Sequence, residues 1–207
     1  MVLYGDSVIL VYAKAPVAGK VNTRLIADIG VQAATELQFD LIHHRLTMLA
    51  EANLCDLRLL CAPDQQHEAF LSCKKQYPIT LHKQPGDDLG ARMFNGIDDA
   101  LQEYKYCIVI GTDAPALGAE KIKQAIEVLH DGTEVVFVPA EDGGYVLVAM
   151  RQAYKCLFEN ISWGSAQVMQ QSRDILNKNN IPFRELAYCW DVDEPEDYQR
   201  YLQFMNA

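Results

Sequence analysis

Short apolar runs alternate with longer amphipathic segments along most of the chain. The apolar runs have few polar residues at alternate positions, which is typical of strands that are buried on both faces of a sheet. The predicted strands are residues 7–13, 56–62, 79–84, 106–111, 134–140, 145–150 and 183–188.

Helical periodicity fills several of the intervals between these runs. Leu89, Met93, Ile97 and Leu101 recur every four residues and give the segment 89–104 one apolar stripe. Comparable patterns predict further helices at about 31–52, at 118–132 and at 194–205. The last of these begins with a proline and acidic residues, which favour a helix start.

The order of these elements predicts the fold class. Alternating strands and helices indicate an α/β sandwich with a mostly parallel sheet and right-handed crossovers. The runs 134–140 and 145–150 are joined by a short Gly-Gly loop without a helix, so we expect one antiparallel element in a mixed sheet. Because the chain contains no repeat, low-complexity tract or linker, we expect a single domain over residues 1–207.

Composition narrows the possible partners. The 207 residues carry a net charge of -10, which argues against nucleic acid as a partner. No apolar stretch approaches the roughly 20 residues that span a bilayer, and the N-terminus lacks the features of a signal peptide. Six cysteines are scattered without a C-x-x-C pair, which favours reduced thiols. We therefore expect a cytoplasmic protein without a membrane span.

A basic loop follows the first predicted strand and carries Lys14, Lys20 and Arg24. Open α/β sheets bind ligands at such strand ends, and Gly19 allows a close approach of the backbone to a ligand. The loop lacks both the G-x-x-x-x-G-K-[ST] and the G-x-G-x-x-G patterns. Two interpretations remain open from the residues alone: a binding site for phosphate or diphosphate, and a solvated basic turn.

Carboxylates follow the buried strand 106–111 and precede the last predicted helix. Asp113 with Asp191 or Asp193 makes an oxygen-rich pair of the kind that holds Mg²⁺ or Mn²⁺ against a diphosphate. Such an ion and the loop cations would together neutralise a departing phosphate. The alternative for Asp193 is that it caps the helix that follows.

The stretch Asp142-Gly143-Gly144 predicts a tight turn between two strands. Its glycines also permit the close approach of a flat ring, and Asp142 is available for a hydroxyl group, for a metal or as a base. The stretch can form the turn between the strands and also contact a ligand. Trp163 and Trp190 are either stacking partners for a ring or members of the core.

Six stretches in this order give the chain a resemblance to a known family. They are AKAPVAGKVNTRL, QPGDDLGARM, VIGTDAPAL, PAEDGGYVLVAM, LFENISWGSAQV and WDVDEPEDY. Nearly the whole chain resembles the bacterial glycosyltransferase-A-fold family of arsenosugar-biosynthesis-type glycosyltransferases. That family is related to the nucleotidyltransferases that attach nucleotides to molybdopterin and 2-phospholactate.

The resemblance implies a three-layer α/β/α fold of the nucleotide-diphospho-sugar transferase type and a site for each part of the substrates. According to this resemblance, the residues near the nucleotide are Lys14, Gly19, Lys20, Arg24, Gly90 and Arg92. The residues near the sugar or the acceptor are Gly143, Gly144, Tyr145 and Trp163. Asp113 resembles the metal-binding aspartate, with Asp191 or Asp193 as its partner.

Two positions depart from the family's pattern. Asn22 stands where the family commonly has a lysine, and Gly164-Ser165 stand where it usually has Ser-Thr. Three hypotheses follow. The first is a metal-dependent glycosyltransferase that moves a sugar from a nucleotide sugar to a small-molecule acceptor, with Asp142 positioning or deprotonating the acceptor. The second is a nucleotidyltransferase in which a phosphorylated substrate attacks a nucleoside triphosphate and releases pyrophosphate. The third is a nucleotide-binding relative without turnover, which Asn22 motivates.

Overall fold

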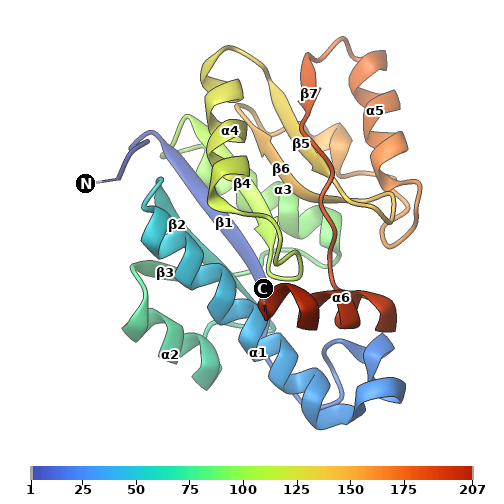
Figure 1. Cartoon of the computed structure of the whole chain (residues 1–207). Coiled ribbons are helices and arrows are strands. Elements are labelled where there is room, and N and C mark those ends of the chain that lie inside the picture. The colour runs from blue at the N-terminus through green and yellow to red at the C-terminus, as the bar shows by residue number, and fades with distance from the viewer. Residues whose placement is uncertain (1, 207) are drawn as a thin grey trace.

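The computed structural model describes residues 2–206, and its strands form one seven-stranded sheet in the order β3-β2-β1-β4-β6-β5-β7 (Figure 1). The strands are β1 (Ser7–Lys14), β2 (Asp56–Ala62), β3 (Ile79–Lys83), β4 (Tyr106–Gly111), β5 (Val135–Pro139), β6 (Tyr145–Met150) and β7 (Phe183–Glu185). All seven predicted strands are therefore present. The last is shorter than expected, because β7 pairs with β5 at only three positions.

The sheet contains parallel and antiparallel strands, as the short loop between residues 134–140 and 145–150 predicted. β1 pairs in parallel with β2 and β4, whereas β6 is antiparallel to both β4 and β5. β5 therefore runs in the same direction as β1 and β4. As a result, the turn between β5 and β6 lies at the edge of the sheet where β1 and β4 end.

Helices cover both faces of the sheet. They are α1 (Ile26–Ala52), α2 (Glu68–Gln76), α3 (Leu89–Ala100), α4 (Ala119–His130), α5 (Val168–Lys178) and α6 (Pro195–Met205), with short 3₁₀ turns η1 (Thr23–Leu25) and η2 (Lys155–Leu157). One buried cluster joins α1, α2 and α4 to one face, and a second joins α3 and α5 to the other. This arrangement confirms the predicted three-layer α/β fold.

The pattern of apolar residues did not reveal α2 and α5. Only Phe70 and Cys73 are buried in α2, which is nine residues long, so its apolar stripe is too short to stand out. In α5 the buried positions include Ser172, whose hydroxyl donates to the carbonyl of Val168 at 2.9 Å. A polar residue on the inner face weakens the periodic signal.

A third, smaller cluster lies at the edge of the sheet where β1 and β4 end. It joins the start of α1 to α6 and to the segment before α6, which lie together in Figure 1. Its buried members are Leu25, Leu37, Leu41, Trp190, Val192 and Tyr201. The basic loop and the C-terminal carboxylates are thus parts of one packed unit.

The six cysteines are free thiols in the described residues. Within residues 2–206, no helix has the length and apolarity that crossing a membrane requires. α1 has its one break at Gly30, where φ is 81°, so the segment after Gly30 coincides with the predicted helix 31–52.

Candidate functional site

A cleft of about 650 Å³ opens at the edge of the sheet where β1 and β4 end. Its walls come from the basic loop, the start of α3, the turn after β4, the turn between β5 and β6, and the segment before α6. Of the residues that the sequence indicated, the cleft is lined by Lys14, Lys20, Arg24, Arg92, Asp113, Asp142, Tyr145, Asp191 and Asp193. The structure therefore brings the candidate cations and carboxylates together.

The remaining candidates shape the cleft without lining it. Gly90 packs against the backbone of Phe158 and the indole of Trp163, whose Nε1 would lie 2.8 Å from an added Cβ. Gly143 has a φ of 93° and lies against the backbone of Ala166. Gly19 and Gly144 likewise belong to the loops behind the lining residues. Trp163 packs edge-on against Tyr145, with 6.4 Å between the ring centroids.

The basic loop is fixed to α1 by two side-chain amides. Gln38 donates from Nε2 to the carbonyl of Lys14 at 3.1 Å. Asn22 donates from Nδ2 to the carbonyl of Ala34 at 2.9 Å and has the left-handed backbone conformation that asparagine tolerates well (φ 47°). Asn22 therefore orders the loop at a position where the family's pattern has a charge.

Arg24 connects the basic loop to the C-terminal segment. Its guanidinium forms ion pairs with Asp193 and, at 3.3 Å, with Glu194. Glu194 is also the N-cap of α6, and Asp197 completes a capping box by accepting from the backbone of Glu194 at 2.9 Å. The capping role considered for Asp193 thus belongs to Glu194, and Asp193 is neutralised by Arg24.

Asp113 and Asp191 are two carboxylates of the cleft that do not pair with Arg24, so they remain free to bind a ligand or a metal. Asp113 follows β4 and is open to the cleft, but protein atoms surround it on its other sides, and this burial raises the pKa of its carboxyl. Burial, with repulsion from Asp113 and Asp142, raises the pKa of Asp191 to about 7. A cation would stabilise an arrangement in which two carboxylates repel Asp191.

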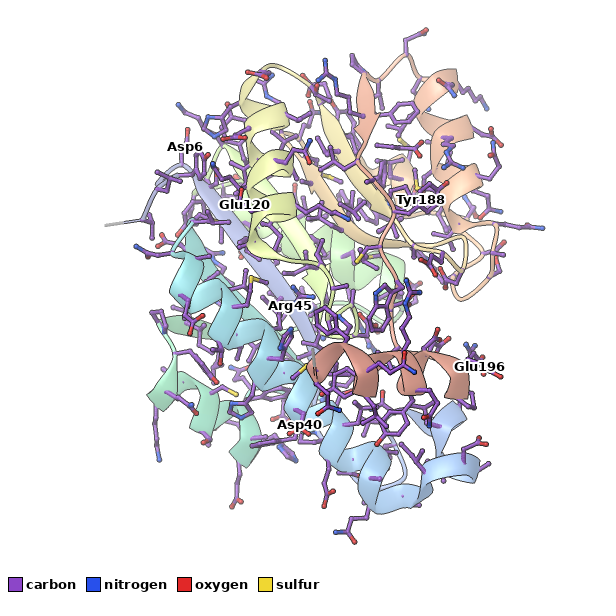
Figure 2. The ribbon with its side chains drawn as sticks, in the orientation of Figure 1. Asp6, Asp40, Arg45, Glu120, Tyr188 and Glu196 are labelled. Carbon is purple, nitrogen blue, oxygen red and sulfur yellow. The ribbon has the colours of Figure 1, made fainter. Side chains whose placement is uncertain are left out.

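A buried arginine holds the turn that carries Asp113. Arg45 projects from α1 toward this turn and is fully buried (Figure 2). It donates to the carbonyls of Ala114 and Leu117, while its Nε has no partner within residues 2–206. The backbone of Val192 donates to the carbonyl of Asp113 at 2.8 Å, so the two carboxylate segments are also joined directly.

The donor set suits a divalent cation that is shared with a substrate phosphate. Within residues 2–206, no group of three or more His, Cys, Asp or Glu side chains forms a metal cage of its own. Mg²⁺ commonly takes one or two protein carboxylates and completes its shell with phosphate oxygens and water. Asp113 and Asp191 are the residues that fit this requirement.

A second cavity of about 240 Å³ adjoins the cleft. Arg24, Asp142, Gly164, Asp191 and Asp193 line both. Ser165 and Trp190 line only the second cavity. The rest of Trp190 is buried, and the guanidinium carbon of Arg200 lies 4.6 Å from the centroid of its ring. Asp142 therefore lies where the two cavities meet.

Comparison with known families identifies the family of the chain. Residues 45–165, more than half of the chain, match the sequence model of a family described as "Uncharacterized protein conserved in bacteria (DUF2064)". The chain belongs to this family. No curated protein matches the sequence.

Solved structures share the fold of this DUF2064 protein. A candidate nucleotide-diphospho-sugar transferase from Desulfovibrio desulfuricans G20 is 28% identical, with a TM-score of 0.82 over 92% of this chain and 83% of the other. CMP:2-keto-3-deoxy-manno-octonic acid synthetase in complex with CTP is 11% identical (TM-score 0.64; 98% and 99% covered). The 4-diphosphocytidyl-2C-methyl-D-erythritol synthase of Anaerococcus prevotii DSM 20548 is 9% identical (TM-score 0.65; 98% and 97% covered). These likenesses confirm the predicted fold class.

Several residues that line or support the cleft were not predicted from the sequence. Gln38 and Gln84 line the cleft but are uncharged, and only their hydrogen bonds reveal a role. Arg45 had a detectable signal, because it is a charged residue on the apolar side of a helix, next to Ile42, Leu46 and Leu49. A buried charge at such a position requires partners, and the partners are the carbonyls next to Asp113.

Proposed function

We propose that this DUF2064 protein is a metal-dependent glycosyltransferase of the arsenosugar-biosynthesis type that its motifs resemble. It would move a sugar from a nucleotide diphosphate sugar to a small-molecule acceptor. The observation that carries the proposal is the convergence of Lys14 and Lys20 with Asp113 and Asp191 on one cleft. Cations for phosphates and carboxylates for a metal are the two requirements of a diphosphate leaving group.

The charged residues of the cleft divide the work in this reaction. Lys14 and Lys20 bind the diphosphate oxygens, and Arg24 joins them when it exchanges its carboxylate partners for phosphate. Asp113 and Asp191 hold Mg²⁺ or Mn²⁺. The ion, when bound, neutralises the charge that develops on the diphosphate as the sugar leaves.

Asp142 is the candidate for orienting or deprotonating the acceptor. Its Oδ1 accepts from the backbone of Gly144 at 2.8 Å, and this bond fixes the carboxylate at the junction of the two cavities. The acceptor then occupies the smaller cavity, and the nucleotide sugar occupies the larger one.

A second candidate is nucleotidyl transfer, because a synthetase that binds CTP shares the fold. The same lysines and carboxylates would then bind a nucleoside triphosphate, and pyrophosphate would leave. The released product separates the two reactions: a nucleoside diphosphate indicates glycosyl transfer, and pyrophosphate indicates nucleotidyl transfer.

The first test is a thermal-shift screen of nucleoside diphosphates, nucleoside triphosphates and nucleotide sugars, with and without Mn²⁺. A ligand at a hundred times its Kd adds about 2.7 kcal/mol to the free energy of unfolding. In a chain of this length that corresponds to roughly 5–10 °C in Tm. A Mn²⁺-dependent shift with a nucleotide sugar, followed by release of a nucleoside diphosphate, is the expected result.

Asp113→Asn should remove the Mn²⁺-dependent part of this shift. The matched control is Asp131→Asn, because Asp131 is exposed at the C-terminal end of α4, on the side of the molecule away from the cleft. An unchanged Mn²⁺-dependent shift in Asp113→Asn would show that the metal site is assigned to the wrong residue. The absence of any shift with all nucleotides would refute the proposed function.

A further inference from the structure

Gln84 presents a fixed hydrogen-bond acceptor at the end of the cleft away from the carboxylates. It directly follows β3, and its backbone donates to the carbonyl of Cys61 at 3.1 Å. Its side-chain nitrogen donates to the carbonyls of Leu60 at 2.8 Å and Ala13 at 3.2 Å. Because both amide hydrogens are used, the orientation of the amide is determined. Its oxygen, Oε1, accepts no hydrogen bond within residues 2–206.

The turn after Gln84 is fastened to α3. Arg92 donates from Nε to the carbonyl of Gly86 at 3.0 Å, and Asn95 donates from Nδ2 to the carbonyl of Pro85 at 3.0 Å. Asp88 caps α3 by accepting from the backbone of Ala91 at 2.8 Å. These bonds fix Gln84 before any ligand binds, and preorganisation of this kind increases selectivity.

The surroundings of Gln84 suit a flat ring. Leu89, which also lines the cleft, is 46% exposed at the first turn of α3. Met93 lines the cleft one helical turn further on. Tyr12 also lines the cleft, and its hydroxyl donates to the carbonyl of Arg92 at 2.8 Å. Arg92 lines the cleft too, and its Nη1 has no hydrogen bond within the described residues.

The order of the strands sets the direction in which a nucleotide lies. Gln84 follows β3, Lys14 ends β1 and Asp113 follows β4, and the sheet order is β3-β2-β1-β4. At 4.7–4.9 Å between neighbouring strands, the ends of β3 and β4 are about 14 Å apart. A nucleotide with its phosphates between Lys14 and Asp113 therefore directs its base toward Gln84.

We propose that Gln84 and Arg92 form the base subsite and read a lactam edge, that is, a ring N–H beside a C=O group. Oε1 of Gln84 accepts from the ring N–H, and Arg92 donates to the neighbouring carbonyl oxygen. Uracil and guanine have such an edge. Adenine has no carbonyl group, and cytosine presents an amine beside a ring nitrogen. The inference deepens the proposed function, on which it rests for the identity of the ligand as a nucleotide.

The test is isothermal titration calorimetry in the presence of Mn²⁺ with UDP, GDP, CDP, ADP and N3-methyl-UDP. A missing hydrogen bond to a buried polar group costs about 1–3 kcal/mol, or roughly 5- to 150-fold in affinity. UDP and GDP are therefore expected to bind at least tenfold more tightly than CDP and ADP. N3-methyl-UDP, which lacks the N–H group, should bind at least tenfold more weakly than UDP.

Gln84→Met completes a double-mutant cycle with the methylated ligand. If Oε1 reads the N–H group, the variant binds UDP and N3-methyl-UDP with equal affinity. Gln32→Met is the matched control, because Gln32 is exposed on α1 and bonds only to Glu36. An unchanged preference for UDP in Gln84→Met, or a wild-type preference for ADP or CDP, would overturn the inference.

Two further measurements keep the result interpretable. Gln84→Met leaves the carbonyls of Leu60 and Ala13 without this donor, so the Tm of the variant is measured to detect a loss of stability. Binding of pyrophosphate in the presence of Mn²⁺ is measured as a probe of the phosphate subsite. Equal binding of pyrophosphate shows that the variant is folded. If the variant unfolds, the comparison of UDP with N3-methyl-UDP in the wild type decides alone. Nucleotides that bind without any base preference contradict only this inference, whereas binding of none contradicts the proposed function as well.

Discussion

The substitution Arg45→Met tests whether the buried guanidinium holds the turn that carries Asp113. Methionine matches the stem of arginine as far as the position of Nε, so the change removes mainly the end of the guanidinium group, with its charge and its donors. The carbonyls of Ala114 and Leu117 then lose their hydrogen bonds.

The magnitude follows from these two carbonyls. A buried polar group that loses its partner costs about 1–3 kcal/mol, so the two together cost about 2–6 kcal/mol. Removal of the buried charge offsets part of this loss, because burial disfavours the charged guanidinium and lowers the pKa of Arg45 to about 10 even though Asp113 acts to raise it. We expect a net loss of about 3 kcal/mol in the free energy of unfolding. For a chain of this length, the loss corresponds to roughly 6–12 °C in Tm.

The assay is thermal unfolding of wild type, Arg45→Met and Arg45→Lys, with Arg184→Met as the exposed control on β7. The control should change the free energy of unfolding by less than about 0.5 kcal/mol. Lysine keeps the charge but reaches fewer acceptors, so its loss should fall between those of the control and methionine. A Tm for Arg45→Met equal to or above that of wild type would refute the reasoning, because desolvation of the charge would then outweigh its hydrogen bonds.

Three further predictions concern the cleft, the turn beside it and the thiols. The pKa of Asp191 is raised from 3.8 to about 7, so the folded state binds the proton more tightly than the unfolded state does. The carboxyl of Asp191 therefore destabilises the fold increasingly as pH rises from about 4 through 7. Without divalent cations, Asp191→Asn should therefore raise Tm at pH 8 more than at pH 5, and an equal effect at both would contradict this. Gly143→Ala should lower Tm, because φ is 93° and the added Cβ would meet the backbone of Ala166; an unchanged Tm would argue against this turn geometry. In native protein, a thiol reagent should label Cys156 first, since the other five cysteines are buried, and mass spectrometry of the labelled peptides can verify the order.

The strands and their order along the chain were predictable because most of them are buried on both faces, which leaves continuous apolar runs such as residues 106–111. The location of Lys14, Asp113 and Asp142 at one edge followed from the direction of the strands alone. The local motifs thus indicate which edge of the sheet carries the candidate site.

The partnerships within the site were not predictable in the same way. Arg24 and Asp193 are 169 residues apart in sequence, and their pairing depends on how η1 packs against α6. The free oxygen of Gln84 depends on carbonyls from two other strands. Asn22 looked like a lost charge, whereas its side chain fastens the loop to α1. Such roles arise from tertiary contacts, which no local pattern contains.

The ion pairs of Arg24 have a consequence for the salt dependence of ligand binding. Both partners of Arg24 are about half exposed, and pairs of this kind contribute at most about 1 kcal/mol, so a phosphate can replace them at little cost. Because Arg24 is already compensated by protein carboxylates, it releases no dissolved anion when the phosphate arrives. In the proposed site, Lys14 and Lys20 are then the two cations of the loop that would exchange mobile anions for the ligand. The affinity for a phosphate ligand should therefore fall less steeply with ionic strength than a loop with three cations would suggest.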